Sequence, residues 1–414
     1  MTQLNLALAA AGLLALGLGA VSGRLERSLL QEPMIAVAAG VAIGPFALDL
    51  LDVTDWGDEG VIREEAARLT LAVALMGSAL RLDRDDLRAL WRPATVLLTL
   101  AMLGMWAASS LLAGMLFALP LWTAALVGAA VTPTDPVTAS AIVTGDFAKR
   151  HLPERLRAGL TLESGGNDGL AYLLLFLPVL MLAHPPGEAW ERWLLDRLLV
   201  GVVVAAVLGV AIGWGAARLL HAVRARGWVE NYSFLTYTVA LSLFTLGATE
   251  LAGADALISV FVAGLVFTVA SDTGDKHEEE NVQEAIAKLF TLPMFFLIGL
   301  SLPWDDWARL GWPVAAFALG LLLLRRPPVL ALLGPLLRPT YGARDRAYLG
   351  WFGPVGVAAV FYASLAERET GIALAWHLGS AAVLASVLVH GITAAPLTRL
   401  YGRAAGGGEA PPRS

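Results

Sequence analysis

The stretch Glu163-Ser-Gly-Gly-Asn-Asp-Gly169 places polar side chains inside an otherwise apolar part of the sequence. Glu163 and Asn167 are four residues apart, as are Ser164 and Asp168, so each pair shares a face if the stretch is helical. The Ser164 hydroxyl and the Asp168 carboxylate then offer hard oxygen atoms one turn apart, which suit alkali cations and hydronium. This spacing predicts a site for a monovalent cation or a proton at Asp168.

A second apolar stretch contains the sequence Thr-Pro-Thr-Asp-Pro, in which Pro133 and Pro136 interrupt any helix. Unwound backbone is tolerated at membrane depth only inside protein or against water. We expect this stretch to add the Thr134 hydroxyl and free carbonyl oxygens to the cation site. The Asp135 carboxylate has two interpretations: it binds the cation, or it satisfies the Asn167 amide and the broken backbone.

Charged residues inside apolar segments cost about 2.5–3.5 kcal/mol each at the bilayer centre, so each needs a partner or a use. Burial favours a protonated carboxyl group, so a proton and a cation can compete for Asp168; the alternative is a hydrogen-bonded structural acid. Glu163 lies about 7.5 Å from Asp168 along a helix axis. Arg325 and Arg326 are adjacent bases inside an apolar segment. We expect Glu163 to form an ion pair with Arg326, and we expect this ion pair to hold helices together rather than to carry ions.

The composition indicates that a membrane surrounds these residues. Of 414 residues, 57% are hydrophobic and 15% are charged, whereas soluble domains have about 25% charged residues. This nearly excludes a cytosolic enzyme. The chain has no cysteine, which excludes disulfides and thiolate metal sites. No stretch suits nucleic acid, and we expect no cofactor besides the transported ions.

Thirteen apolar segments predict an all-α integral membrane protein with about 13 transmembrane helices. They span residues 3–22, 33–51, 66–82, 94–119, 121–144, 156–182, 196–220, 231–251, 254–271, 286–302, 310–333, 346–366 and 373–397. No Lys or Arg precedes Arg24, so we expect the first segment to be an uncleaved helix rather than a signal peptide. The Gly- and Pro-rich tail 404–414 is expected to be disordered and cytoplasmic.

The distribution of positive charge predicts the orientation. Of 29 Lys and Arg residues, 21 lie in alternate connections and the C-terminal end, and 6 lie in the other connections. Positive loops stay in the cytoplasm. We therefore expect a multi-pass protein of the inner (plasma) membrane, with the N-terminus outside and the C-terminus in the cytoplasm.

The twelfth segment is also interrupted, by Gly353, Pro354 and Gly356. The interrupted segments are the fifth and the twelfth, and this odd offset inverts the topology. We therefore predict two inverted six-helix repeats, at about 3–182 and 231–397, joined by a linker helix at about 196–220. Paired broken helices in such repeats mark the binding site of transporters. The alternative is that each interruption is only a kink.

At these residues the sequence resembles the sodium/proton exchangers of the first monovalent cation:proton antiporter family, of the NhaP and NHE type. The motifs lie on the fifth, sixth, eleventh and twelfth segments. They are Thr134-Asp135-Pro136, Glu163-Ser164-x-x-Asn167-Asp168-Gly169, Arg326-Pro327 and Gly353-Pro-x-Gly-Val357.

The resemblance implies a homodimer with a dimerisation domain and a mobile six-helix core. It implies that Asp168 carries Na⁺ and H⁺ in turn, that Ser164 and Thr134 are further Na⁺ ligands, and that Asp135 lies close by. We expect the ion-binding residues to be Asp168, Ser164, Thr134, Asp135 and Asn167. Asn167 stands where electrogenic relatives have a second Asp, which implies electroneutral exchange.

The sequence departs from the family pattern at two positions. Gly77 stands where members often have an acid, so the outer coordination of the ion, and with it the choice of cation, is expected to differ. Val355 stands where members usually have a base. We expect any role of that base in pH response or dipole neutralisation to be absent or relocated.

The predicted function is antiport of a monovalent cation, Na⁺ or alternatively K⁺, against H⁺ by alternating access, within membrane lipid. A cation channel would need a continuous pore with rings of charge or carbonyls. An intramembrane aspartyl protease would use Asp135 and Asp168 as a dyad, but a Gly-x-Gly-Asp stretch is absent. A co-transporter of organic anions would need anion-binding residues, and none stands out. The acidic stretch 271–284 is expected to be a solvated connector, with pH sensing as the alternative.

Overall fold

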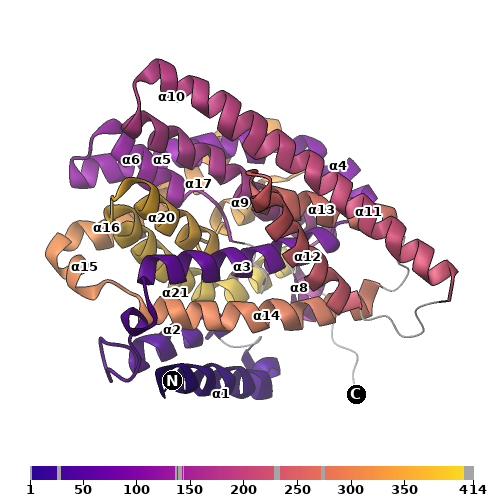
Figure 1. The fold of residues 1–414 in the computed structure, drawn as a ribbon, viewed down its shortest axis with the longest axis horizontal. Coiled ribbons are helices and arrows are strands. Elements are labelled where there is room, and N and C mark those ends of the chain that lie inside the picture. The colour runs from indigo at the N-terminus through magenta and orange to yellow at the C-terminus, as the bar shows by residue number, and fades with distance from the viewer. Residues whose placement is uncertain are drawn as a thin grey trace.

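The protein folds into a bundle of helices in a computed structural model (Figure 1). The structure describes residues 2–25, 29–135, 138, 142, 144–227, 234–271 and 276–404, and these contain no β-strand. The helices are α1 (Thr2–Leu25), α2 (Glu32–Ile43), η1 (Val53–Trp56), α3 (Glu59–Leu80), α4 (Arg84–Val96), η2 (Leu97–Ala101), α5 (Met102–Phe117), α6 (Leu121–Ala130), α8 (Gly145–His151), α9 (Glu154–Ala183), α10 (Pro186–Arg192), η3 (Trp193–Val204), α11 (Ala205–Ala225), α12 (Phe234–Leu251), α13 (Ala256–Ser271), α14 (Lys276–Leu300), α15 (Trp304–Leu310), α16 (Trp312–Leu324), α17 (Pro327–Leu332), α18 (Gly334–Leu337), α19 (Ala343–Trp351), α20 (Val357–Thr370) and α21 (Leu374–Ala404).

Within these described residues, six helical stretches are long and apolar enough to cross a membrane. A seventh results if the bent pair Ala287–Leu300 and Trp304–Leu310 is one span. Four shorter apolar helices accompany them, among them Glu32–Ile43, Leu121–Ala130 and Ala256–Ser271. The chain is thus an all-helical protein with several apolar helices of spanning length, as the composition predicts.

Some helices differ in length from the apolar segments. Helix α2 ends at Ile43, well short of residue 51, because Gly44 and Pro45 follow it and the Gly44 backbone is extended. Helix α3 begins at Glu59, ahead of the apolar run, because the Asp58 side chain accepts a hydrogen bond from the Val61 N–H (3.0 Å). Such an N-cap satisfies a backbone donor that the first turn leaves free.

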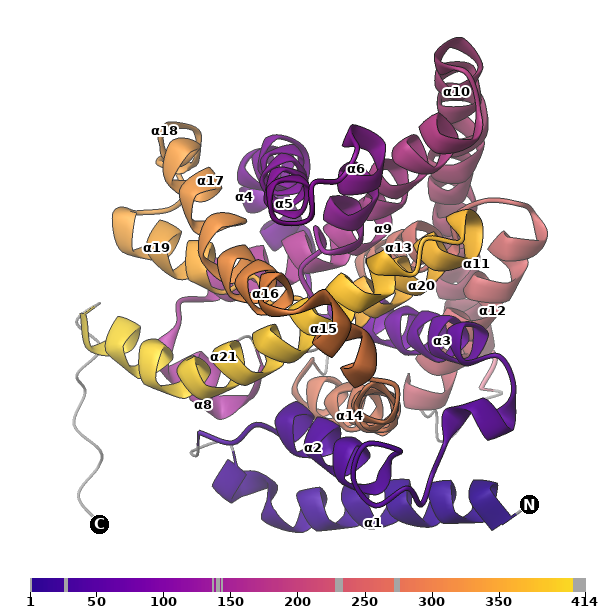
Figure 2. The same cartoon turned by 90° about the vertical axis from the view of Figure 1, so that its left-hand side faces the viewer.

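Helix α9 lies at the centre of the bundle and packs against α3, α6, α13 and α20. Figure 2 shows α1, α2 and α14 along one side of the molecule and α4, α5, α6 and α10 towards the other. This position buries α9 among helices from both halves of the chain, and α9 carries the polar stretch from Glu163 to Asp168.

Two segments lose their helical hydrogen bonds inside the bundle. Helix α6 ends at Ala130, and residues 131–135 are not helical. Helix α19 ends at Trp351, and α20 begins only at Val357. These are the predicted interruptions; Pro136 lies outside the described residues, as do residues 272–275 of the acidic stretch and 405–414 of the tail.

Candidate functional site

The two unwound segments meet. The Asp135 N–H donates a hydrogen bond to the Pro354 carbonyl (2.9 Å), which joins the first break directly to the second. A Cβ atom at Gly356 would collide with the Asp135 carboxylate, and one at Gly353 would collide with the Arg326 side chain. The glycines of the second break therefore make room for side chains that come from two other segments.

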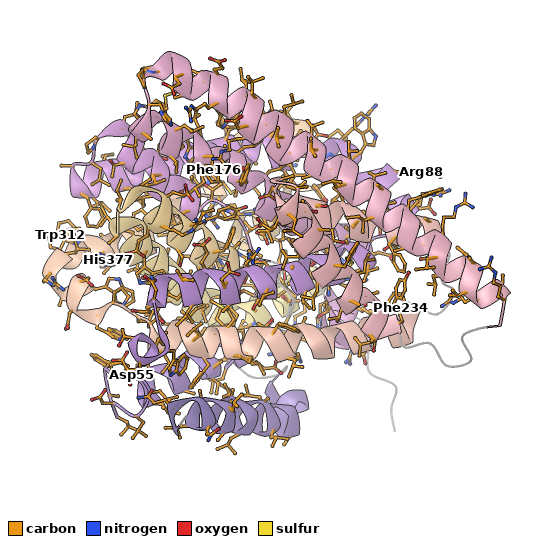
Figure 3. The ribbon with its side chains drawn as sticks, in the orientation of Figure 1. Asp55, Arg88, Phe176, Phe234, Trp312 and His377 are labelled. Carbon is orange, nitrogen blue, oxygen red and sulfur yellow. The ribbon has the colours of Figure 1, made fainter. Side chains whose placement is uncertain are left out.

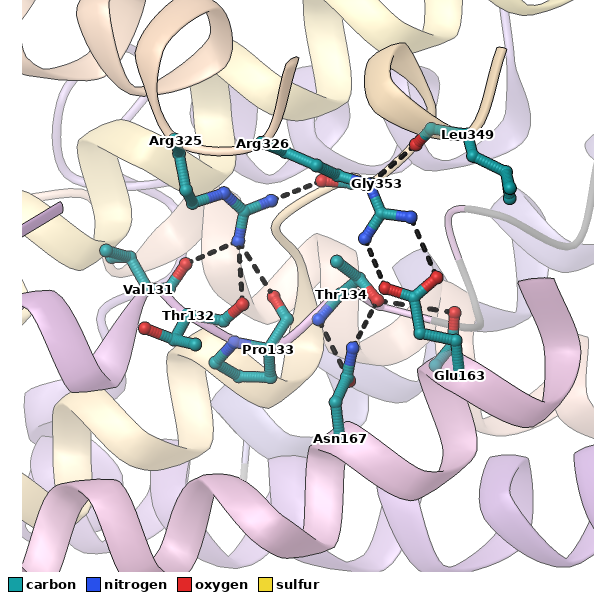
Figure 4. A network of polar contacts seen from close by, with 11 residues as sticks. Val131, Thr132, Pro133, Thr134, Glu163, Asn167, Arg325, Arg326, Leu349 and Gly353 are labelled. Atoms are coloured by element: carbon teal, nitrogen blue, oxygen red, sulfur yellow. Dashed lines mark hydrogen bonds and ion pairs between the residues drawn. The ribbon is translucent and has the colours of Figure 1, made fainter. Parts of the chain in front are cut away.

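Thr134 connects the first break to α9 (Figure 4). The Thr134 N–H donates to Asn167 Oδ1 (3.1 Å), and Asn167 Nδ2 donates to Thr134 Oγ1 (2.6 Å). Thr134 Oγ1 in turn donates to Ser164 Oγ (3.5 Å). All three side chains are buried. The structure thus brings three of the expected cation-site residues into one hydrogen-bonded group.

Asp135 supports the chain that follows the break. Its Oδ2 atom accepts hydrogen bonds from the Thr138 N–H (3.0 Å) and from Thr138 Oγ1 (2.6 Å). The carboxylate thus satisfies backbone just after the break, which agrees with part of the second interpretation of Asp135. Thr134 is bonded to both ends of the Asn167 amide. That Asp135 binds a cation stays a prediction.

Arg325 joins the two breaks electrostatically (Figure 4). Its Nη1 atom donates to the carbonyl oxygens of Val131 (2.6 Å), Thr132 (2.9 Å) and Pro133 (3.2 Å). Its Nη2 atom donates to the Gly353 carbonyl. A buried guanidinium with five donors therefore already binds the carbonyls of this part of the first break. That the stretch also offers carbonyls to a cation stays a prediction.

Arg326 forms an ion pair with Glu163 of α9. Arg326 Nη2 donates to Glu163 Oε2 (2.8 Å), and Arg326 Nη1 contacts Oε1. The third guanidinium nitrogen, Nε, donates to the Leu349 carbonyl (2.6 Å) of α19. Both side chains are almost fully buried. A two-pronged pair of this kind fixes orientation as well as distance, and here it ties α9 to the segments around the second break.

Asp168 differs from its neighbours because neither carboxylate oxygen has a hydrogen-bond partner among the described residues. The side chain is fully buried. Its main-chain carbonyl, by contrast, accepts a hydrogen bond from the Tyr362 hydroxyl of α20. A buried carboxylate without partners is costly if it is ionised and empty, so this position requires a proton or a cation.

Two residues of this site, Arg325 and Tyr362, were not assigned a role from the sequence. Arg325 has a recognisable signal, because it is a base inside an apolar segment. It also supplies a positive charge at the crossing where Val355 gives none; Val355 is buried, and its N–H donates to Ser386 Oγ (2.7 Å). For Tyr362, the sequence offers only a hydroxyl group in an apolar segment, which is not enough to predict a role in the site.

Gly77 lies on the buried face of α3. It borders a small pocket together with Thr238 and Ser242 of α12. Among the residues that line this pocket, none is charged.

Comparison with known proteins agrees with this architecture. A family model described as "Sodium/hydrogen exchanger, transmembrane" matches residues 12–400. The Na(+)/H(+) antiporter 2 of Zygosaccharomyces rouxii is 30% identical over 401 residues, which cover 89% of this chain and 50% of that protein. The chain therefore spans about half the length of that relative.

Two further similarities concern substrate and fold. The K(+)/H(+) antiporter NhaP2 of Shewanella sp. (strain ANA-3) is 28% identical over 386 residues, covering 92% of this chain and 64% of that protein. The structure of the sodium proton antiporter MjNhaP1 from Methanocaldococcus jannaschii superposes with a TM-score of 0.74, at 19% identity, over 97% of this chain and 100% of that one. At this identity the superposition shows a shared fold.

Proposed function

Because this chain belongs to the family of transmembrane sodium/hydrogen exchangers, we propose that it exchanges Na⁺ for H⁺ across the membrane. The observation that carries the proposal is the Asp168 carboxylate, which is fully buried and has no hydrogen-bond partner among the described residues. A group of this kind is stable when it holds a proton or a cation.

In the proposed mechanism the two ions compete for Asp168. Na⁺ binds the carboxylate together with the hydroxyl oxygens of Ser164 and Thr134, while Asp135 and Asn167 hold the unwound backbone around it. Protonation of Asp168 removes the charge that binds Na⁺. The site then crosses the membrane loaded with one ion or the other by alternating access, which couples the two gradients.

The architecture proposed for this motion is that of two inverted repeats, at about 3–182 and 231–397, around the linker helix at about 196–220, with 13 membrane-crossing helices. The hydrogen bond from Asp135 to Pro354 supports it, because it joins the broken segment of one repeat to that of the other. We further propose a homodimer in the plasma membrane, with the N-terminus outside, the C-terminus in the cytoplasm and a role in pH homeostasis.

Electroneutral exchange is proposed because Asn167 is an amide and leaves Asp168 as the titratable group of its turn. K⁺/H⁺ exchange is the alternative, and the similarity to a protein named as a K(+)/H(+) antiporter supports it. A channel is a weaker candidate, because the site residues are bonded to one another across the crossing rather than arranged around a pore.

Reconstituted vesicles test the proposal. The purified chain is placed in vesicles with an internal pH dye, and Na⁺, K⁺ or Li⁺ is added between pH 6 and 9. We expect saturable proton movement driven by Na⁺, with lower rates at both ends of the pH range because protons hold Asp168 at low pH and are scarce at high pH. Asp168→Asn should abolish the movement.

A matched control is Asp255→Asn. Asp255 is also buried, but its Oδ1 atom accepts a hydrogen bond from the Ile258 N–H (2.8 Å) at the start of α13, which Asn can also do. This variant should retain exchange. Full activity in Asp168→Asn would refute the assignment of the carrier, and a response to K⁺ alone would favour the alternative substrate.

A further inference from the structure

Asp55, Trp312 and His377 lie at one end of the molecule, opposite the end with Arg88 and Phe234 (Figure 3). A cavity at the first of these ends has His377 in its wall. It has a volume of about 920 Å³. The start of α3, helix α15, the last turns of α20 and the start of α21 contribute its walls. By the distribution of positive charge, this end faces the outside.

The lining of the cavity favours cations. Six carboxylate side chains line it, against three arginines. Two hydroxyls on its wall, Ser301 Oγ and Ser364 Oγ, are buried and have no hydrogen-bond partner among the described residues. Negative charge in a concave, low-dielectric surface concentrates cations, and the two hydroxyls offer oxygen atoms that water or a hydrated cation would satisfy.

Two ion pairs connect α3 to α20 beside this cavity. Arg63 Nη2 lies 3.1 Å from Glu367 Oε2, and Arg63 is also bound to Glu59 (2.8 Å) and stacked on Trp376. In the other direction, Arg368 of α20 binds Glu64 of α3.

The Arg368–Glu64 pair is two-pronged. Arg368 Nε and Nη2 lie 2.8 and 3.0 Å from the two Glu64 oxygens. Arg63 and Glu64 are buried, and Arg368 is half exposed. Each helix thus supplies one acid and one base at adjacent positions. The base of one ion pair comes from α3, and the base of the other comes from α20.

Helix α20 leads from this cavity to the carrier residue. Tyr362 bonds the Asp168 carbonyl, Ser364 lies two residues further along, and Glu367 follows by one turn. Helix α20 therefore runs from the cavity to the main chain at Asp168, and the two ion pairs join α20 to α3 beside the cavity.

We propose that the cavity is an access vestibule for hydrated monovalent cations, and that the ion pairs Arg63–Glu367 and Glu64–Arg368 form the gate between this vestibule and Asp168. The inference rests on the proposed exchange function. The gate must open for each cation that enters or leaves on this side, so α3 and α20 must separate at these pairs during transport.

The absence of cysteine from the chain makes a direct test possible. In the variant Arg63→Cys/Glu367→Cys, dibromobimane bridges the two thiols and becomes fluorescent, which reports the bridge independently of transport. We expect the bridged protein to lose Na⁺-driven proton movement relative to the same protein before treatment. The control is Glu59→Cys/Arg63→Cys, whose bridge lies within α3 and should leave the activity of that variant unchanged by the reagent.

The outcomes separate the gate from the function. If the unmodified chain shows no exchange, the proposed function fails; if it exchanges ions and the fluorescent Arg63–Glu367 bridge has no effect, the gate is refuted. Where that variant does not fold or bridge, Glu64→Cys/Arg368→Cys tests the same contact.

The vestibule has its own test, which does not depend on transport. His377→Cys should react with a membrane-impermeant maleimide added from the outside, because His377 lines the cavity and is partly exposed. Ser109→Cys should stay unlabelled, because Ser109 is fully buried in α5 and bonded to the Met105 carbonyl. Absence of labelling at position 377 would overturn the vestibule.

Discussion

Thr134 and Asn167 are joined through both ends of the Asn167 amide, which accepts from the Thr134 N–H and donates to the Thr134 hydroxyl. One side chain of α9 thereby fixes the unwound backbone of the first break. The same turn of α9 carries Asp168, so any movement of the break relative to α9 also changes the surroundings of the proposed carrier. Asn167 thus has a structural role in addition to its lack of charge.

The first prediction concerns this amide. In the proposed electroneutral exchange, an imposed membrane potential should not change the rate of the unmodified chain. Asn167→Asp adds a second titratable group beside Asp168, and we expect its exchange to become sensitive to potential. The measurement is proton movement in vesicles with a potassium diffusion potential. A rate that already depends on potential in the unmodified chain would contradict electroneutrality.

The second prediction concerns Arg325, which binds carbonyls of both breaks. Arg325→Lys keeps the charge but lacks the planar fork that reaches four carbonyls. Each lost bond to a charged group costs about 1.5–3 kcal/mol, so we expect a clear fall in thermal stability and slower exchange, with Arg325→Gln worse than Arg325→Lys.

A matched control for this series is Arg309→Gln. Arg309 is an exposed residue of α15 in a surface ion pair with Asp306, and surface substitutions of this kind change stability by about 0.5 kcal/mol or less. Equal unfolding temperatures for Arg325→Gln and Arg309→Gln in the same detergent would contradict the role of Arg325.

Much of this site could be predicted from the sequence, because its residues are expensive in lipid. Asp168, Glu163 and the two arginines stand out among apolar neighbours, and Pro133 and Gly353 mark the breaks. That Glu163 lies against Arg326 follows from the need of each buried charge for a partner.

Other features depend on three-dimensional packing and have no local signal. The crossing of two breaks that lie far apart in the sequence decides which carbonyls Arg325 reaches. Helix α20 brings the Tyr362 hydroxyl to the Asp168 carbonyl. This contact could not be predicted, because hydroxyl residues are common in apolar helices and do not by themselves indicate a partner. The end of α2 at Ile43 also escaped prediction, because the residues after Gly44 are apolar without being helical.

The third prediction concerns Gly356. A methyl group there would overlap the Asp135 carboxylate, and overpacking of a buried contact costs about 1–3 kcal/mol. We expect Gly356→Ala to lower the unfolding temperature and to slow exchange, because Asp135 and the backbone bond to Pro354 must shift together. Gly247→Ala is the control, since nothing lies within 4 Å of a Cβ at that position. Normal exchange in Gly356→Ala would show that the crossing tolerates this displacement.

The fourth prediction separates the structural ion pair from the carrier. Removal of one partner from a buried pair costs about 3–5 kcal/mol, because the other charge is left uncompensated. Glu163→Gln and Arg326→Gln should therefore each destabilise the protein strongly, while the double variant should lose less than the sum of the two.

Exchange by the folded double variant decides the role of Glu163. If the pair only holds α9 to the second break, the surviving activity should keep the pH dependence of the unmodified chain, because Asp168, the proposed proton carrier, is still present. The measurement is the rate of Na⁺-driven proton movement across the pH range, normalised to folded protein. A displaced pH dependence in the double variant would instead mean that Glu163 takes part in ion transfer. The assignment of a purely structural role to Glu163 would then be wrong.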